Sequence, residues 1–288
     1  MTHLDLRPSP IAGTWYERDR ERLAHAVDGY LDAAQNPAPH GDVIAVIAPH
    51  AGHRYSGSVA GYAFAPLRTR TFELVAVIAP FHDFEVHPLL TTAHGAYHTP
   101  LGHISVDRPA LNDLNSALKS KLGFGLTPIA RDREHSLEIE LPFLQRALAG
   151  EFKLLPVMVR AQQAGVARGL GLALAQVLKN KNALLVASTD LSHFYDQAAA
   201  SQLDAEMLKR FESFRPEAIF EAENAGQGFA CGAAAVAAVL WAARELGADK
   251  VQVLHHATSG DVTGDFSRVV GYGAAIVTKK ATRPPAHS

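Results

Sequence analysis

The fold is decided by the stretch at residues 43–57, which reads VIAVIAPHAGHRYSG. Its first six residues carry no polar side chain and are rich in β-branched residues, so they predict a short, fully buried strand. Pro49 ends this strand because proline has no N–H for the hydrogen-bond ladder. The next residue is His50. Since ligands of open α/β sheets bind at the carboxyl ends of the strands, the stretch predicts a site at His50.

A second strand with a similar ending follows about thirty residues later. Residues 74–82 read LVAVIAPFH, so a second apolar run again closes on Ala-Pro and leads to a histidine, His82. Two histidines presented by two similar strand ends are positioned to converge on one point. We therefore expect His50 and His82 to belong to the same site.

The rest of the chain alternates between predicted helices and predicted strands. Apolar residues at helical spacing predict helices at 20–34, 58–64, 109–122, 136–149, 166–178, 198–211, 216–223 and 233–246, with a kink or late start at Pro142 in the fourth. Further strands are predicted at 88–93, 152–159, 183–188, 251–254 and 271–278, and a loop at 97–102. No linker interrupts this pattern. It predicts an α/β protein: a single three-layer α/β/α domain at 1–280 around a mainly parallel or mixed sheet, followed by a disordered tail at 281–288.

Composition and charge exclude several classes of protein. The 288 residues carry 27 basic and 29 acidic side chains, a net charge of −2 without a basic block, which argues against a nucleic-acid partner. Apolar runs stop well short of the roughly 20 residues that span a bilayer, and the N-terminus has no apolar signal region. One cysteine excludes an internal disulfide. We expect a soluble cytoplasmic protein that acts on a small molecule or a peptide.

Candidate metal ligands and proton carriers fall at strand ends and in a glycine-flanked loop. Histidine is the commonest side-chain metal ligand, and two imidazoles with one anionic ligand are typical of non-haem iron sites. Cys231, in the loop at 226–232, provides the anion, because metal coordination favours the thiolate. After the strand at 183–188, His193 is a candidate acid or base, and Asp190 a candidate acceptor that orients an imidazole.

Other interpretations of the same residues stay open. A strand-end histidine can be a packing group, Cys231 a small buried residue, and Asp190 a helix cap. His135 lies at the entrance of the predicted helix at 136–149, and we include it with Asp190 and His193 among the candidate catalytic residues; alternatively, Glu134 and His135 form a surface pair. The spacing gives no H-x-x-x-H or C-x-x-C motif.

At these residues the chain resembles the Memo family, the "mediator of cell motility" proteins and their bacterial and archaeal relatives. The likeness spans most of the chain and consists of several motifs in the same order: AGTWY at 12–16, IAPHAG at 47–52, TPLG at 99–102, EHSLE at 134–138, STDLSH at 188–193 and Cys231-Gly232. Prokaryotic members of this family are associated with an AMMECR-type protein and a radical-SAM protein, which the resemblance implies as partners.

The resemblance also implies a fold and a metal. Memo proteins are similar in fold to the catalytic subunits of class III extradiol dioxygenases, in which two histidines and a glutamate bind Fe(II) and a further histidine is the acid or base. Carried over by motif, His50 and His82 are the imidazole ligands, Cys231 replaces the glutamate and His193 is the acid or base. The implied cofactor is Fe(II), with Cu or Zn as alternatives because a thiolate is a softer ligand.

One departure from the family pattern concerns the second ligand. Memo proteins usually carry Gly-Pro-Ser-His there, whereas this chain has Ala79-Pro80-Phe81-His82. We therefore expect the Phe81 ring to stand beside the metal and to narrow the space for a substrate.

Three functions are compatible with these residues. The first is a mononuclear non-haem metal oxidoreductase with dioxygenase-like activity. The second is a non-catalytic protein that binds a peptide or small molecule in the same cleft. The third is a protein that stores or buffers the metal.

Overall fold

A mixed β-sheet forms the centre of the computed structural model, which describes residues 5–35, 39 and 41–280. The predicted tail at 281–288 lies outside these residues. The strands of the sheet are β2 (Asp42–Ala48), β3 (Leu74–Pro80), β4 (Leu89–Thr92), β7 (Thr127–Ile129), β8 (Lys153–Val159), β9 (Ala183–Ser188), β10 (His193–Tyr195), β11 (Lys250–Thr258) and β12 (Val269–Lys279). Their order is β10-β12-β2-β9-β3-β8-β4-β7, and β11 pairs with β12 as well.

The middle of the sheet is parallel. Strands β2, β9, β3 and β8 run in one direction. Strand β12 runs antiparallel to β2, and β4 runs antiparallel to β8 but parallel to β7. Helices cover both faces of β3, which explains why all of its residues are buried and why it reads as one continuous apolar run. The carboxyl ends of β2, β9 and β3 therefore meet at one edge, with β9 between the two strands that carry His50 and His82.

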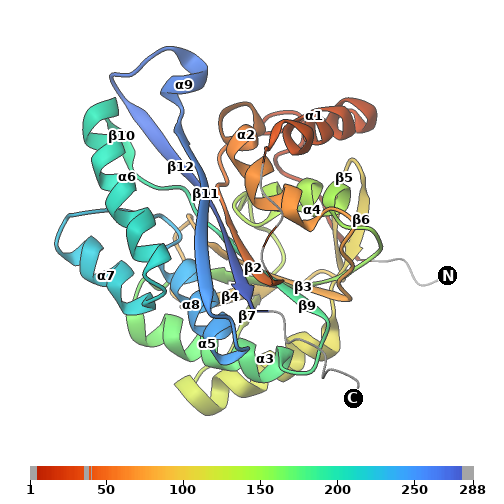
Figure 1. Cartoon of the computed structure of the whole chain (residues 1–288). Coiled ribbons are helices and arrows are strands. Elements are labelled where there is room, and N and C mark those ends of the chain that lie inside the picture. Colours follow the sequence, from red (N-terminus) through yellow and green to blue (C-terminus); the bar gives the residue numbers. More distant parts are fainter. Residues whose placement is uncertain (1–4, 36–38, 40, 281–288) are drawn as a thin grey trace, which may run out of the picture.

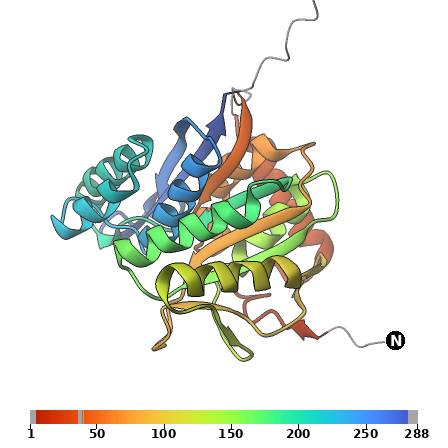
Figure 2. The ribbon, with the colours of Figure 1, turned by 90° about the horizontal axis from the view of Figure 1, so that it is seen from below.

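Helices cover both faces of the sheet, as Figures 1 and 2 show. On one face, α1 (Arg20–Ala33) and α4 (Leu141–Ala147) pack against α2 (His53–Phe64), which lies on β2, β11 and β12. On the other face, α3 (Arg108–Leu122), α5 (Ala164–Leu178) and α8 (Ala233–Glu245) lie side by side, and α7 (Pro216–Asn224) and α6 (Gln197–Glu212) continue this layer toward β12. The predicted three-layer α/β/α architecture is confirmed. No helix among the described residues has the length and apolar character to cross a membrane.

Small residues allow the helices α5 and α8 to pack closely against each other. All residues of α8 from Ala233 to Ala243 are buried. A Cβ atom at Gly171 of α5 would lie only 2.6 Å from the Ala238 carbonyl oxygen. The two helices therefore pack with their backbones in close contact.

A small second sheet corrects one sequence prediction. The predicted loop at 97–102 is instead part of a hairpin, because β5 (Ala96–Thr99) pairs with β6 (Gly102–Ser105), and β1 (Leu6–Arg7) pairs with β5 on its other side. Buried Tyr97 alternates with exposed His98, as in a strand with one covered face. Pro100 and Leu101 form only the turn, so the proline-glycine signal marks the turn alone.

Two predicted helices begin at other residues than expected. Helix α2 starts at His53, five residues before the predicted start, directly after Gly52. Helix α4 starts at Leu141, with Pro142 in its first turn, after a 3-10 turn at Glu138–Glu140. The late start indicated by Pro142 is confirmed, because proline is tolerated in a first turn where its missing N–H has no helical partner.

Candidate metal centre

Three histidines converge at the carboxyl edge of the parallel strands. His50 follows β2, His82 follows β3, and His135 comes from the segment that precedes the 3-10 turn. One ring nitrogen from each side chain lies within 4.8 Å of the other two. The ring centres are 5.3 Å apart for His50 and His82 and 4.8 Å apart for His82 and His135. Imidazoles at this separation, with no basic side chain between them, offer a cation several nitrogen ligands at once.

His50 is fixed by the end of β9. Its backbone N–H donates to Asp190 Oδ1 at 2.7 Å, and its Nδ1 lies 2.9 Å from Ser188 Oγ. The side chain is only 2% exposed. Burial and the neighbouring histidines together hold the pKa of His50 well below its ordinary value, so the imidazole is neutral at pH 7.

His82 is held by the Glu134 carboxylate. Glu134 accepts hydrogen bonds from the His82 backbone N–H at 2.6 Å and from its Nδ1 at 3.0 Å, and from the backbone N–H groups of His135 and Ser136. Burial would lower the pKa of His82, but this carboxylate raises it, and the same bonds hold the pKa of Glu134 well below its ordinary value despite burial. Glu134 is 4% exposed, so the alternative of a Glu134–His135 surface pair is wrong.

His135 completes the group of imidazoles. Its ring packs against Trp15 at an angle of 31°, with 4.0 Å between the ring centres, and its Nδ1 lies 3.4 Å from Glu134 Oε1. Burial lowers the pKa of His135 to about 4. In all three histidines Nδ1 thus lies next to a protein oxygen. Among the described residues, Nε2 of His82 and of His135 has no hydrogen-bond partner, whereas Nε2 of His50 lies next to Cys231 Sγ. Metal-binding histidines usually hold one ring nitrogen in this way and present the other to the metal.

Cys231 lies next to His50. Its Sγ atom is 3.2 Å from His50 Nε2 and accepts the backbone N–H of Asp190 at 3.3 Å. Burial, together with the negative charge of Asp190, raises the pKa of the Cys231 thiol above its ordinary value. The thiol therefore stays protonated without a cation, and a bound metal ion would favour the thiolate. Among the described residues, the group that could hold a metal ion consists of the three histidines, and Cys231 is not part of it. Imidazole nitrogens fit a transition metal rather than Mg²⁺ or Ca²⁺.

Asp190 and His193 border the same site but have different surroundings. Asp190 is buried, which raises its pKa to about 7, although the backbone N–H groups of His50 and Ala51 oppose the shift. It does not begin a helix, since the chain continues into β10, so the helix-cap alternative is wrong. His193 is exposed at the mouth of the site, and desolvation and the charge of His82 lower its pKa. Asp190 can therefore exchange a proton near neutral pH, and His193 is neutral there and can accept one.

The site opens into a hollow of about 600 Å³. Its walls include the histidines, Asp190 and a group of mostly aromatic side chains: Trp15, Tyr55, Phe194, Val270 and Tyr272. Phe194 has a positive φ of 67°, a conformation that is costly for a bulky residue and recurs at functional sites. An apolar hollow with a few convergent polar groups is typical of a small-molecule site.

The expectation for Phe81 is not met. Its side chain is 8% exposed, packs in the hydrophobic core and is not among the residues that line the hollow. The reason is the alternation along an extended chain, in which consecutive side chains point in opposite directions. His82 faces the site, and Phe81 therefore faces the core.

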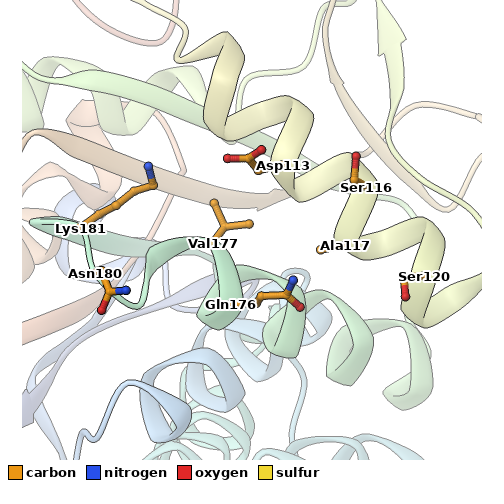
Figure 3. A pocket seen from close by; sticks show the side chains of 8 residues that line it. All are labelled: Asp113, Ser116, Ala117, Ser120, Gln176, Val177, Asn180 and Lys181. Carbon is orange, nitrogen blue, oxygen red and sulfur yellow. The ribbon is translucent and has the colours of Figure 1, made fainter.

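A second hollow, of about 610 Å³, lies on the far helical layer. Figure 3 shows its lining on α3, α5 and the residues just after α5: Asp113, Ser116, Ala117, Ser120, Gln176, Val177, Asn180 and Lys181. These side chains include no histidine or cysteine and form a polar surface groove. It offers no donor set comparable with the histidine site.

Hydropathy and spacing do not identify several residues of the site. Ser188, Trp15 and Arg268 reach the site from separate parts of the chain, and only Ser188 belongs to a predicted strand, as its last residue. Glu134 adjoins His135 in the sequence, but its contact with His82 joins residues 52 positions apart. Such contacts depend on the arrangement of strands in the sheet.

Fold and site together define an open α/β protein with a candidate mononuclear metal centre at the carboxyl edge of its parallel strands. Comparison with known proteins identifies the family: the model described as "Memo-like protein" matches residues 7–276. A "MEMO1 family protein" of Nitrosopumilus maritimus is 32% identical, over 93% of this chain and 98% of the relative. One of Methanococcoides burtonii is 34% identical, over 94% and 100%. The chain belongs to the Memo family.

Proposed function

We propose that the chain binds one transition-metal ion at this site, with His50, His82 and Cys231 as ligands and His135 as a further nitrogen donor. The observation that carries the proposal is the approach of three ring nitrogens to within 4.8 Å of one another, with each Nδ1 next to a protein oxygen. The lowered pKa values of His50 and His135 support it, because only a neutral imidazole has a lone pair for a metal.

The family resemblance favours Fe(II), whereas the softer Cys231 thiolate favours Cu or Zn, which are the alternatives. A bound ion would supply a Lewis acid or a redox centre. The chain's own residues supply the rest: His193 takes up or releases a proton at the mouth of the hollow, and Asp190, whose pKa is about 7, exchanges one in a buried position. The aromatic walls hold a small apolar or aromatic molecule and exclude water. This arrangement supports an oxidoreductase with dioxygenase-like chemistry.

Metal content tests the proposal. The chain is purified without oxygen, and its iron, copper and zinc are measured together with those of His82→Ala, Cys231→Ala and, as a matched control, His98→Ala, which removes an exposed imidazole on β5. We expect close to one equivalent in the wild type and in the control, and a large loss in the other two. A wild-type protein that stays empty after reconstitution with each metal refutes the proposal. Tight binding without turnover of any organic substrate favours metal storage.

A second candidate function rests on Arg268. This residue lines the hollow, with its guanidinium 5.4 Å from the centre of the Phe194 ring, and it makes no hydrogen bond or ion pair with the described part of the chain. An unpaired arginine beside aromatic walls suits a small molecule or peptide that carries an anionic group. Under this proposal Arg268→Gln abolishes binding of such a ligand, whereas His82→Ala does not.

A further inference from the structure

A buried serine and a buried glutamate lie behind His50, on the side away from the hollow. Ser188 Oγ has three polar neighbours: His50 Nδ1 at 2.9 Å, the Ser136 carbonyl oxygen at 2.7 Å and Glu140 Oε1 at 2.7 Å. Ser188 and Glu140 have no solvent-exposed surface. The second carboxyl oxygen of Glu140, Oε2, is buried and has no hydrogen-bond partner.

Counting protons limits the directions of these bonds. A serine hydroxyl has one proton to donate and two lone pairs to accept with, so it can donate to only one of the Ser136 carbonyl and Glu140. The Ser136 carbonyl can only accept. If Ser188 donates its proton there, the other two neighbours can bond to Ser188 only as donors: His50 through an Nδ1–H, and Glu140 through a carboxylic acid O–H.

The unpartnered Oε2 atom supports a neutral Glu140 independently. A buried carboxylate oxygen without a partner costs much more free energy than the carbonyl oxygen of a neutral acid. The alternative, an ionised Glu140 that accepts the Ser188 proton, would leave the Ser136 carbonyl without that bond and Oε2 charged and unpaired. Burial also raises the pKa of Glu140 well above its ordinary value, and the charge of Asp190 adds to this.

We propose that Glu140 is a neutral carboxylic acid which donates to Ser188, and that Ser188 holds His50 as its Nδ1–H tautomer. The lone pair of His50 is then on Nε2, the atom that faces Cys231 Sγ at 3.2 Å. Ser188 and Glu140 are positioning residues: they act on the site through His50. The role of this relay rests on the proposed metal site, but the protonation states belong to the metal-free chain and are tested there.

Nitrogen NMR of the metal-free protein, labelled with ¹⁵N-histidine and treated with a chelator, tests the tautomer. The His50 signals are assigned by their loss in His50→Gln. We expect the long-range ¹H–¹⁵N pattern of an Nδ1–H imidazole in the wild type and loss of that single pattern in Ser188→Ala. Ser56→Ala is the matched control: it also removes one buried hydroxyl bond to a backbone carbonyl, that of Ala51, and should leave the His50 pattern unchanged.

Infrared spectroscopy tests the protonation of Glu140. At pH 7 the wild type should show the carbonyl stretch of a neutral carboxylic acid, which disappears in Glu140→Gln. The glutamine can still donate to Ser188 through its amide group, so this variant should keep the Nδ1–H pattern of His50. The wild-type spectra and this variant decide the matter even if Ser188→Ala does not fold.

The outcomes separate this inference from the metal proposal. An Nε2–H or doubly protonated His50 in the wild type, or an infrared spectrum that Glu140→Gln leaves unchanged, overturns the inference. If it holds, we expect Ser188→Ala to bind Zn(II) about 10- to 100-fold more weakly than Ser56→Ala. An Nδ1–H pattern in a chain that binds no metal supports the inference and counts against the metal proposal.

Discussion

Replacing Glu134 with glutamine is the sharpest test of how the site is built. All the groups around this carboxylate are donors: the backbone N–H of His82 and its Nδ1, and the N–H groups of His135 and Ser136. Glutamine has the same shape but only one acceptor oxygen. Whichever way the amide is turned, its NH₂ group must face at least one buried N–H.

The cost follows from these contacts. Glu134 is 4% exposed, so water cannot replace the lost bonds. A lost hydrogen bond to a charged group costs about 1.5–3 kcal/mol, and an unsatisfied buried donor about 1–3 kcal/mol. Because the two overlap, we expect Glu134→Gln to lower the free energy of unfolding by about 2–4 kcal/mol. For a chain of this size that corresponds to a lower Tm by about 3–7 °C.

Denaturation of the metal-free protein at pH 7 measures this difference, with Glu245→Gln at the exposed end of α8 as the control. The difference also depends on pH. The folded-state pKa of Glu134 lies below its ordinary value of 4.5, so its contribution is complete above that pH and is lost as the pH falls below it. The gap between Glu134→Gln and the wild type should narrow in acid. A gap below about 0.5 kcal/mol at pH 7, the range of a neutral surface substitution, refutes the reasoning.

Three further predictions concern neighbouring parts of the structure. A Cβ atom at Gly232 would lie 2.3 Å from the Ser188 carbonyl oxygen, so Gly232→Ala should lower stability by about 1–3 kcal/mol and reduce metal content, which denaturation and elemental analysis measure. Burial lowers the pKa of His53 to about 4, so the unfolded chain binds the proton more readily. Between pH 6.5 and 4 the wild type should therefore lose about 3 kcal/mol more stability than His53→Leu, which acid denaturation curves of the two proteins measure. Arg7 forms buried ion pairs with Asp132 and Glu138, so Arg7→Met should cost about 3–5 kcal/mol in urea unfolding and leave these acids uncompensated.

The sequence was most informative where one strand or helix sufficed to explain the pattern. The apolar runs that became β2, β3 and β9 were predicted almost to the residue, because strands covered on both faces must be apolar throughout. The convergence of His50 and His82 was also predicted, because the carboxyl ends of parallel strands lie at one edge of the sheet. Local signals failed for the hairpin of β5 and β6, whose proline and glycine mark only its turn.

The tertiary structure decided which side chains meet at that edge. Because β9 lies between β2 and β3, Ser188 is brought to His50, and the segment before α4 carries Glu134 and His135 across to His82. Alternation along the chain turns Phe81 into the core, although a motif comparison places it beside the metal. The hydropathy of a segment indicates whether it is buried, and the spacing of its apolar residues indicates a helix or a strand. Neither contains information on the order of the strands in the sheet. The sequence by itself thus determined the α/β class, the edge that carries the site and its main histidines, whereas the partners that set tautomer and charge came only from the order of strands in the sheet.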